Sequence, residues 1–136
     1  MGFDVFGPTR HVRASNVDDG GEPSYDILAM PGAYGLHCPQ LEKLHQRFYE
    51  STTLRFADGS VPALRDELLR LRDAYRARRE PELVIERHIH SRDPRIRDAI
   101  IERVFQEDPV YRVLEDLRLL CEEAIAAEAD VRCEGD

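Results

Sequence analysis

The chain has 136 residues, of which 42% are apolar and 34% are charged, and its formal net charge at pH 7 is −8. This length is close to the commonest size of one domain, and a domain of this size folds without a disulfide or a metal. Abundant Leu, Ile and Val exclude a disordered chain, and the negative charge disfavours nucleic acid and anionic membranes as partners. We therefore expect a single folded domain over residues 1–136.

Three cysteines, Cys38, Cys121 and Cys133, are widely spaced and follow no zinc-binding or redox pattern. An odd number of such residues favours free thiols in a reducing compartment. The first residues lack the basic start and apolar core of a signal peptide, and the longest apolar run is too short to cross a membrane. The expected location is therefore the cytoplasm.

Taken in chain order, the first 35 residues predict short strands and loops. Residues 3–6 alternate between apolar and polar side chains and then stop at Gly-Pro, which indicates a first strand. Gly, Asp, Asn and Pro are concentrated in residues 14–24, which favours a mobile loop. Residues 25–29 allow a second short strand, and residues 30–35 indicate an ordered turn.

The next segments predict two helices. Pro39 suits the first position of a helix, and this helix would place Leu41, Leu44, His45 and Phe48 on one face. Residues 52–59 fit either a short strand or an irregular connection. Ser60 is a good N-cap for a second helix, which we expect to end near Arg79, before Pro81. Its inward residues follow a spacing of three and four: Val61, Leu64, Leu68, Leu71 and Tyr75.

The last third predicts two more helices and a closing strand. Asp93-Pro94 and Asp108-Pro109 each pair a capping Asp with a Pro suited to the first helical turn. The helix from Pro94 would direct Ile96, Ile100 and Val104 inward, and the one from Pro109 would bury Val110, Val113, Leu114, Leu117, Cys121, Ala124 and Ile125. Residues 130–133 alternate as a strand would, and two short strands need each other, so we pair them with residues 3–6. Residues 83–90 fit a strand or a helix, and we favour a helix.

These elements predict a mainly α fold that borders on α+β. Four to five helices surround one core, and a small sheet pairs the N-terminal strand with the C-terminal strand.

Two groups of residues could carry chemistry. Glu86, His88 and His90 resemble metal ligands, because on a strand the two histidines would share a face; on a helix they would diverge. Cys38 precedes a predicted helix and could have a lowered pKa, with His45 as its base. Surface histidines and a core His45 explain both groups more simply, so we predict no metal and no cofactor and favour a non-enzymatic protein.

The charge distribution is the stronger signal. Residues 102–136 contain eleven acidic residues and four arginines, so this stretch carries most of the net negative charge. We expect an acidic outward face on the last helix, and this face would bind a basic partner protein. The contact residues would be Tyr111, Glu115, Asp116, Glu122 and Glu123, with Tyr111 as an aromatic anchor.

The sequence thus predicts a non-enzymatic interaction protein that binds and inhibits a basic partner, as an immunity protein, an antitoxin or a phage-type inhibitor does. One alternative is a small metal-dependent enzyme or metal sensor that uses His88 and His90. Another is a helical homodimer or scaffold. The predicted helix that begins at Ser60 also carries four arginines roughly along one side, and these could hold an anion or an acidic peptide: Arg65, Arg72, Arg76 and Arg79.

The opening Met1-Gly2-Phe3-Asp4-Val5-Phe6-Gly7 resembles the start of certain short, uncharacterised bacterial proteins, some of which also end in Gly-Asp as here. The chain departs from that group in the middle, because it lacks the aromatic-rich stretch and has no Trp. The resemblance implies a bacterial or phage-like origin and an accessory role, and it assigns no functional residue.

Overall fold

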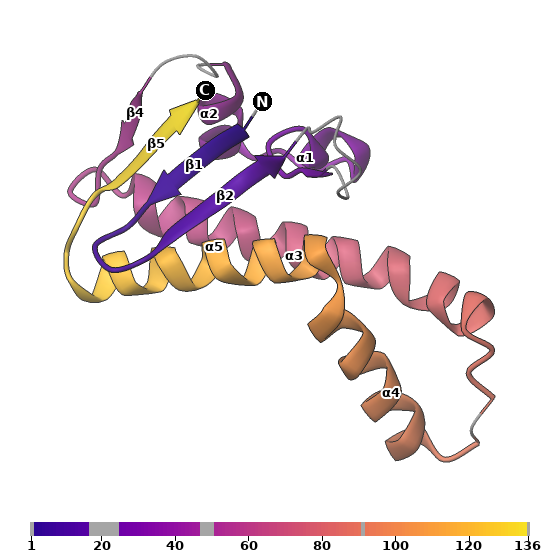
Figure 1. The fold of residues 1–136 in the computed structure, drawn as a ribbon. Helices are drawn as coiled ribbons and strands as arrows, with labels where there is room; N and C mark the ends of the chain where they lie inside the picture. The colour runs from indigo at the N-terminus through magenta and orange to yellow at the C-terminus, as the bar shows by residue number, and fades with distance from the viewer. Residues whose placement is uncertain (1, 17–24, 47–50, 91, 136) are drawn as a thin grey trace.

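A computed structural model describes residues 2–16, 25–46, 51–90 and 92–135. Two long helices, α3 (Ser60–Glu86) and α5 (Pro109–Ala126), lie side by side beneath a sheet, and α4 (Pro94–Glu107) folds back from the far end of α3 (Figure 1). The shorter helices are α1 (Met30–Ala33) and α2 (Pro39–Gln46). The described residues form five helices, within the predicted four to five, although α1 lies where a turn was predicted; helices begin at Pro39, Pro94 and Pro109 as expected.

The sheet has five strands rather than the small terminal pair that we expected. Its order is β3-β2-β1-β5-β4, and every neighbouring pair is antiparallel. The strands are β1 (Gly2–Phe6), β2 (His11–Asn16), β3 (Tyr25–Asp26), β4 (Thr52–Leu54) and β5 (Val131–Gly135). The predicted pairing of the chain ends is confirmed: Val5 pairs with Cys133 and Phe6 with Arg132. The fold is therefore α+β.

One face of the sheet packs on the helices and the other faces outward. Phe3 and Val5 of β1 are buried together with Cys133 of β5, and they share a core with Leu114 and other residues of α5. On the outer face, Asp4 of β1 receives hydrogen bonds from side chains of β2. This in-and-out alternation is what a sheet with one buried face requires.

Several local predictions need correction. The loop predicted over residues 14–24 is wrong at its start, because residues 14–16 belong to β2 and Ala14 and Ser15 are buried. The rest of that predicted loop, residues 17–24, lies outside the described residues. The strand predicted over residues 25–29 is β3, and it ends at Asp26. Within 30–35, one turn of helix forms. Gly59 rather than Ser60 is the N-cap of α3. Phe48, predicted on the inner face of the first helix, also lies outside the described residues.

Helix α3 continues through Pro81 to Glu86, so the predicted end near Arg79 is wrong. Pro81 removes one backbone donor from the helix. Two contacts beyond it offset that loss: Leu83 is buried in a second apolar cluster, and Arg79 Nη1 donates to Glu86 Oε1 at 2.9 Å across the proline. The helical interpretation of residues 83–90 is correct as far as Glu86.

The end of α3 is a left-handed turn. His88 has φ 51°, its N–H donates to Ile85 O at 3.4 Å, and Ile89 N–H donates to Val84 O at 3.2 Å. This pair of bonds is the Schellman arrangement that closes many helices, usually with Gly at the left-handed position. Buried Ile89 then joins the second cluster.

Helix α4 buries a different face from the one predicted. Ile101 and Phe105 pack with Leu83 and Ile89 in the second cluster, whereas Ile96 is 54% exposed and Ile100 is 39% exposed. The apolar residues of α4 cover a wider arc than one packing face. Because α3 continues past Pro81, Leu83 packs on the side of α4 that carries Ile101 and Phe105, and this side is buried. We call the segment that contains the outer part of α3 and all of α4, residues 77–107, the arm; it projects beyond the sheet in Figure 1.

Helix α5 agrees more closely with the prediction. Leu114, Leu117, Cys121 and Ala124 are buried as expected, and Leu120 joins them. Within the described residues, no helix has the length and apolar character needed to span a membrane. All three cysteines are free and buried.

Candidate protein-binding surface

The Glu115 carboxylate lies between two arginines. Arg72 Nη1 of α3 donates to Glu115 Oε1 at 2.5 Å, and Arg118 Nη2 of α5 donates to Oε2 at 2.8 Å. Burial opposes the ionisation of Glu115, but the hydrogen bonds from Arg118 and Arg72 outweigh it and lower the pKa of this carboxyl. Glu115 therefore joins α5 to α3, and its charge is neutralised within the molecule.

The other acidic side chains predicted as partner contacts on α5 also lie near the chain's own arginines. Arg10, in the turn between β1 and β2, places Nε 2.5 Å from Glu123 Oε1 and Nη1 3.9 Å from Asp116 Oδ1. Arg65 Nε lies 3.5 Å from Glu122 Oε1. The acidic side chains on α5 are therefore partly compensated by the chain's own arginines, which weakens the argument for a basic partner at this face; the binding of such a partner stays a prediction.

Tyr111 is partly buried and packs against residues of its own chain. Its ring centroid lies 5.1 Å from that of Phe105, and its hydroxyl accepts a hydrogen bond from Arg76 Nη1 at 3.5 Å. Tyr111 is partly buried against the second cluster. Its contacts therefore hold α4 against α5.

The predicted anion site on α3 is also satisfied internally. Each of its four arginines contacts at least one carboxylate of the chain, so none presents an uncompensated charge to a ligand. The contacts join Arg65 to Asp66 and Glu122, Arg72 to Asp73 and Glu115, Arg76 to Glu80 and Glu102, and Arg79 to Glu82 and Glu86.

The three metal-like residues do not form a common site. Glu86 Oε1 and Oε2 accept hydrogen bonds from Arg79 at 2.9 and 3.0 Å. His88 and His90 follow the helix end, and their ring centroids are 5.9 Å apart. Across the described part of the chain, no group of three or more His, Cys, Asp and Glu side chains is placed to hold a metal ion.

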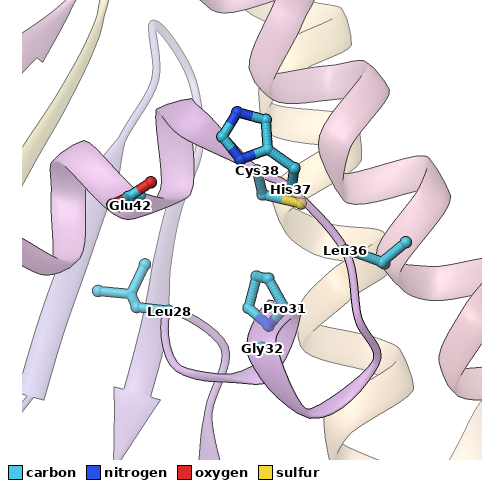
Figure 2. Close-up of a pocket in the computed structure, with 7 residues that line it drawn as sticks. All are labelled: Leu28, Pro31, Gly32, Leu36, His37, Cys38 and Glu42. Carbon is cyan, nitrogen blue, oxygen red and sulfur yellow. The ribbon is translucent and has the colours of Figure 1, made fainter.

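Cys38 lies in a pocket between α1 and α2. Figure 2 shows His37 and Cys38 above Pro31 and Gly32, with Leu28, Leu36 and Glu42 completing the lining. The pocket has a volume of about 230 Å³, below the roughly 300 Å³ at which ordinary ligand sites begin. Burial, with a smaller effect from Glu67, raises the pKa of the Cys38 thiol. The predicted lowering of this pKa is wrong, and the side chain of His45 lies outside the described part of the chain.

The residue that shapes this region is Glu67 of α3. It is 2% exposed, and its Oε1 accepts hydrogen bonds from Gln40 N–H at 2.9 Å and from Leu41 N–H at 3.2 Å. It thus satisfies two backbone donors at the start of α2 that have no partner within the helix. Sequence reasoning missed this role because Gln40 and Glu67 are 27 residues apart.

An exposed apolar surface lies on α4. Ile96 and Ile100, with Ala99 between them, form the floor of a shallow groove, and Arg95 and Arg103 form its borders. We call these five residues the α4 groove. The large exposed apolar side chains of the described residues are Ile85, Ile96 and Ile100, and all belong to the arm. Exposed apolar groups that cluster with a charged border are typical of a protein-binding site.

The arginines near the groove differ from those of α3 and α5. Arg95 forms no ion pair with any carboxylate in the described residues. Arg103 lies 3.9 Å from Glu107, with side chains 82% and 74% exposed, a long and solvated pair that contributes little. The sequence contained this signal, because Ile96 and Ile100 are four residues apart between two arginines, but that spacing indicates core packing equally well.

Comparison of the chain with known protein families, curated proteins and solved structures gives no match.

Proposed function

We propose that this chain is a non-enzymatic interaction protein of the inhibitor class, and that it contacts its partner through the α4 groove. The observation that carries the proposal is the exposure of Ile96 and Ile100 in a helix that packs on the molecule through Ile101 and Phe105. Leaving two isoleucines in water forgoes about 1–2 kcal/mol of burial for each. A partner that covers them recovers this free energy on binding.

The chemistry of the reactive side chains supports binding rather than catalysis. Burial raises the pKa of Cys121 and of Cys133 to about 12, so both thiols are protonated at neutral pH. Glu86, the carboxylate of the metal hypothesis, is held by Arg79. Binding and blocking another protein, as immunity proteins, antitoxins and phage-type inhibitors do, requires neither a nucleophile nor a cofactor.

Docking of a basic partner on α5 is the competing interpretation. The net charge of −8 favours it, but a partner on α5 would have to displace Arg10, Arg65 or Arg72 from the carboxylates that they already contact. Such an exchange of one ion pair for another contributes little net free energy. The α4 groove requires no such exchange, and we therefore favour it.

The experiment compares affinity capture from the native host by four forms of the protein. They are the wild type, an Ile96→Gln/Ile100→Gln variant of the groove, an Ile85→Gln control in the same arm, and an Asp116→Asn/Glu122→Gln variant of α5. We expect a partner retained by the wild type, the control and the α5 variant but lost from the groove variant. Loss from the α5 variant with retention by the groove variant would contradict the proposal. Thermal unfolding by circular dichroism verifies that all four forms fold.

A further inference from the structure

We propose that the occupant of the α4 groove is an amphipathic helix of another protein, with acidic residues along the borders of its apolar face. This inference rests on the proposed function and specifies the chemistry of the partner.

The shape of the groove supports a helical occupant. Ile96, Ala99 and Ile100 repeat at intervals of three and four along α4, so they form a line along one side of a straight helix. Ala99, between the two isoleucines, leaves room for a close approach. A second helix laid along this line would insert its own side chains at i, i+3 or i+4 and i+7, the usual anchors of a helix held in an apolar groove.

The charge of the arm supports acidic borders on that helix. Residues 77–107 contain seven arginines and seven acidic residues, so the arm is neutral and the net charge of −8 belongs to the rest of the chain. Beside the groove itself the balance is positive. The Arg95 guanidinium forms no ion pair with a carboxylate of the described residues, although the Arg95 N–H donates to Asp93, and Arg103 has only the solvated contact with Glu107. Glu or Asp side chains on the partner would complement both arginines.

A second copy of this chain fits the groove less well. In an antiparallel pair of α4 helices centred on Ala99, the rise of 1.5 Å per residue would bring Arg95 of one copy beside Arg103 of the other. In a parallel pair, Arg95 would lie beside its own equivalent. Either arrangement places like charges together at both borders. Nucleic acid is disfavoured by the apolar floor and by the negative charge of the rest of the chain.

The test uses two synthetic helical peptides with identical leucine faces, one bordered by Glu and the other by Lys. Each is titrated into the full-length protein by fluorescence anisotropy at low and at physiological salt. We expect the Glu-bordered peptide to bind at least about fivefold more tightly than the Lys-bordered one, with affinity that falls as salt rises. The Ile96→Gln/Ile100→Gln variant should lose this binding, and Ile85→Gln should retain it.

Three outcomes would overturn the proposal: equal or tighter binding of the Lys-bordered peptide, equal weakening by Ile85→Gln, and competition by duplex DNA. Self-association of the wild type that disappears in the groove variant would also overturn it, because the occupant would then be a second copy. If the peptides fail to bind while the groove variant still loses its partner from the native host, only the acidic-helix inference fails. If capture is also unaffected, the proposed function fails with it.

Discussion

The Tyr75 hydroxyl donates a hydrogen bond of 2.7 Å to Asp108 Oδ2 and so joins the middle of α3 to the junction between α4 and α5. The other oxygen of the same carboxylate, Oδ1, accepts from Val110 N–H at 2.9 Å and Tyr111 N–H at 3.1 Å and caps α5. Burial, followed by the hydrogen bond to Asp108, raises the pKa of Tyr75, so the phenol remains a donor. One aspartate therefore fixes where the arm leaves the rest of the molecule.

Replacement of this aspartate should destabilise the protein more than replacement of a similar surface cap. Asp108→Ala removes the cap and leaves the partly buried Tyr75 hydroxyl without its acceptor, and we expect a loss of about 2–3 kcal/mol in the free energy of unfolding. Asp93→Ala removes the exposed cap of α4, whose Oδ1 accepts from Arg95 N–H at 3.0 Å, and should cost about 1 kcal/mol. Urea unfolding measures both losses, and equal losses would contradict this role of Asp108.

A glycine at the end of α5 should stabilise the chain. Glu128 follows α5 with φ 50°, and its N–H donates to Ile125 O at 3.1 Å in the same type of turn that ends α3. A left-handed conformation costs a residue with a side chain about 1–2 kcal/mol, and Gly avoids this cost. Gly also loses more backbone entropy on folding, which cancels part of the gain in stability. Glu128→Gly should therefore raise stability by about 0.5–1 kcal/mol. Ala127→Gly, at φ −90°, is the control and should lower it.

Local signals in the sequence predicted the helix starts and the pairing of the terminal strands. Asp-Pro pairs define caps within two residues, and Phe3 to Phe6 and Val131 to Cys133 both show the alternation of a half-buried strand. The predicted end of α3 near Arg79 was wrong because the packing of Leu83 on α4 outweighs the helix-breaking effect of Pro81. Propensity near a proline contains no information about that distant partner.

The candidate site was less predictable for the same reason. The acids of α5 are obvious in the sequence, but the arginines that offset them come from the β1–β2 turn and from α3: Arg10 lies 113 residues from Glu123 and Arg72 lies 43 residues from Glu115. The exposed face of α4 was assigned to the core because its apolar residues satisfy a helical spacing on two adjacent faces. The choice between the two faces depends on tertiary packing.

Stability at acidic pH should depend on Glu115. Hydrogen bonds from Arg118 and Arg72 hold its folded pKa below the usual 4.5, so its contribution is complete above about pH 4.5 and is lost as the pH falls through the folded pKa. Glu115→Gln should lower the free energy of unfolding by about 1–2 kcal/mol at pH 7 and by less at pH 3. Glu122→Gln, a solvated site, should change it by less than about 0.5 kcal/mol at either pH. A deficit in Glu115→Gln that is the same at both pH values would contradict the ion-pair account.

Glu67 should show the opposite pH dependence. Burial raises its folded pKa above 4.5 despite the backbone hydrogen bonds from Leu41 and Gln40, so the stability of the wild type should fall as the pH rises from 4.5 through the folded pKa. Glu67→Gln keeps an acceptor oxygen for α2 and should remove this fall. Glu67→Ala leaves two N–H groups without partners and should cost about 1–3 kcal/mol at pH 7. Urea unfolding at pH 5 and pH 7 measures both effects, and an alanine variant as stable as the wild type would contradict the capping role.

The most direct test of the account is a map of where a partner helix touches the protein. Backbone amide resonances of the ¹⁵N-labelled full-length chain are followed as the Glu-bordered amphipathic peptide is added. We expect the largest shifts on residues 92–107, around Ile96, Ala99 and Ile100. Shifts concentrated on residues 110–126 of α5, with the α4 resonances unchanged, would contradict it.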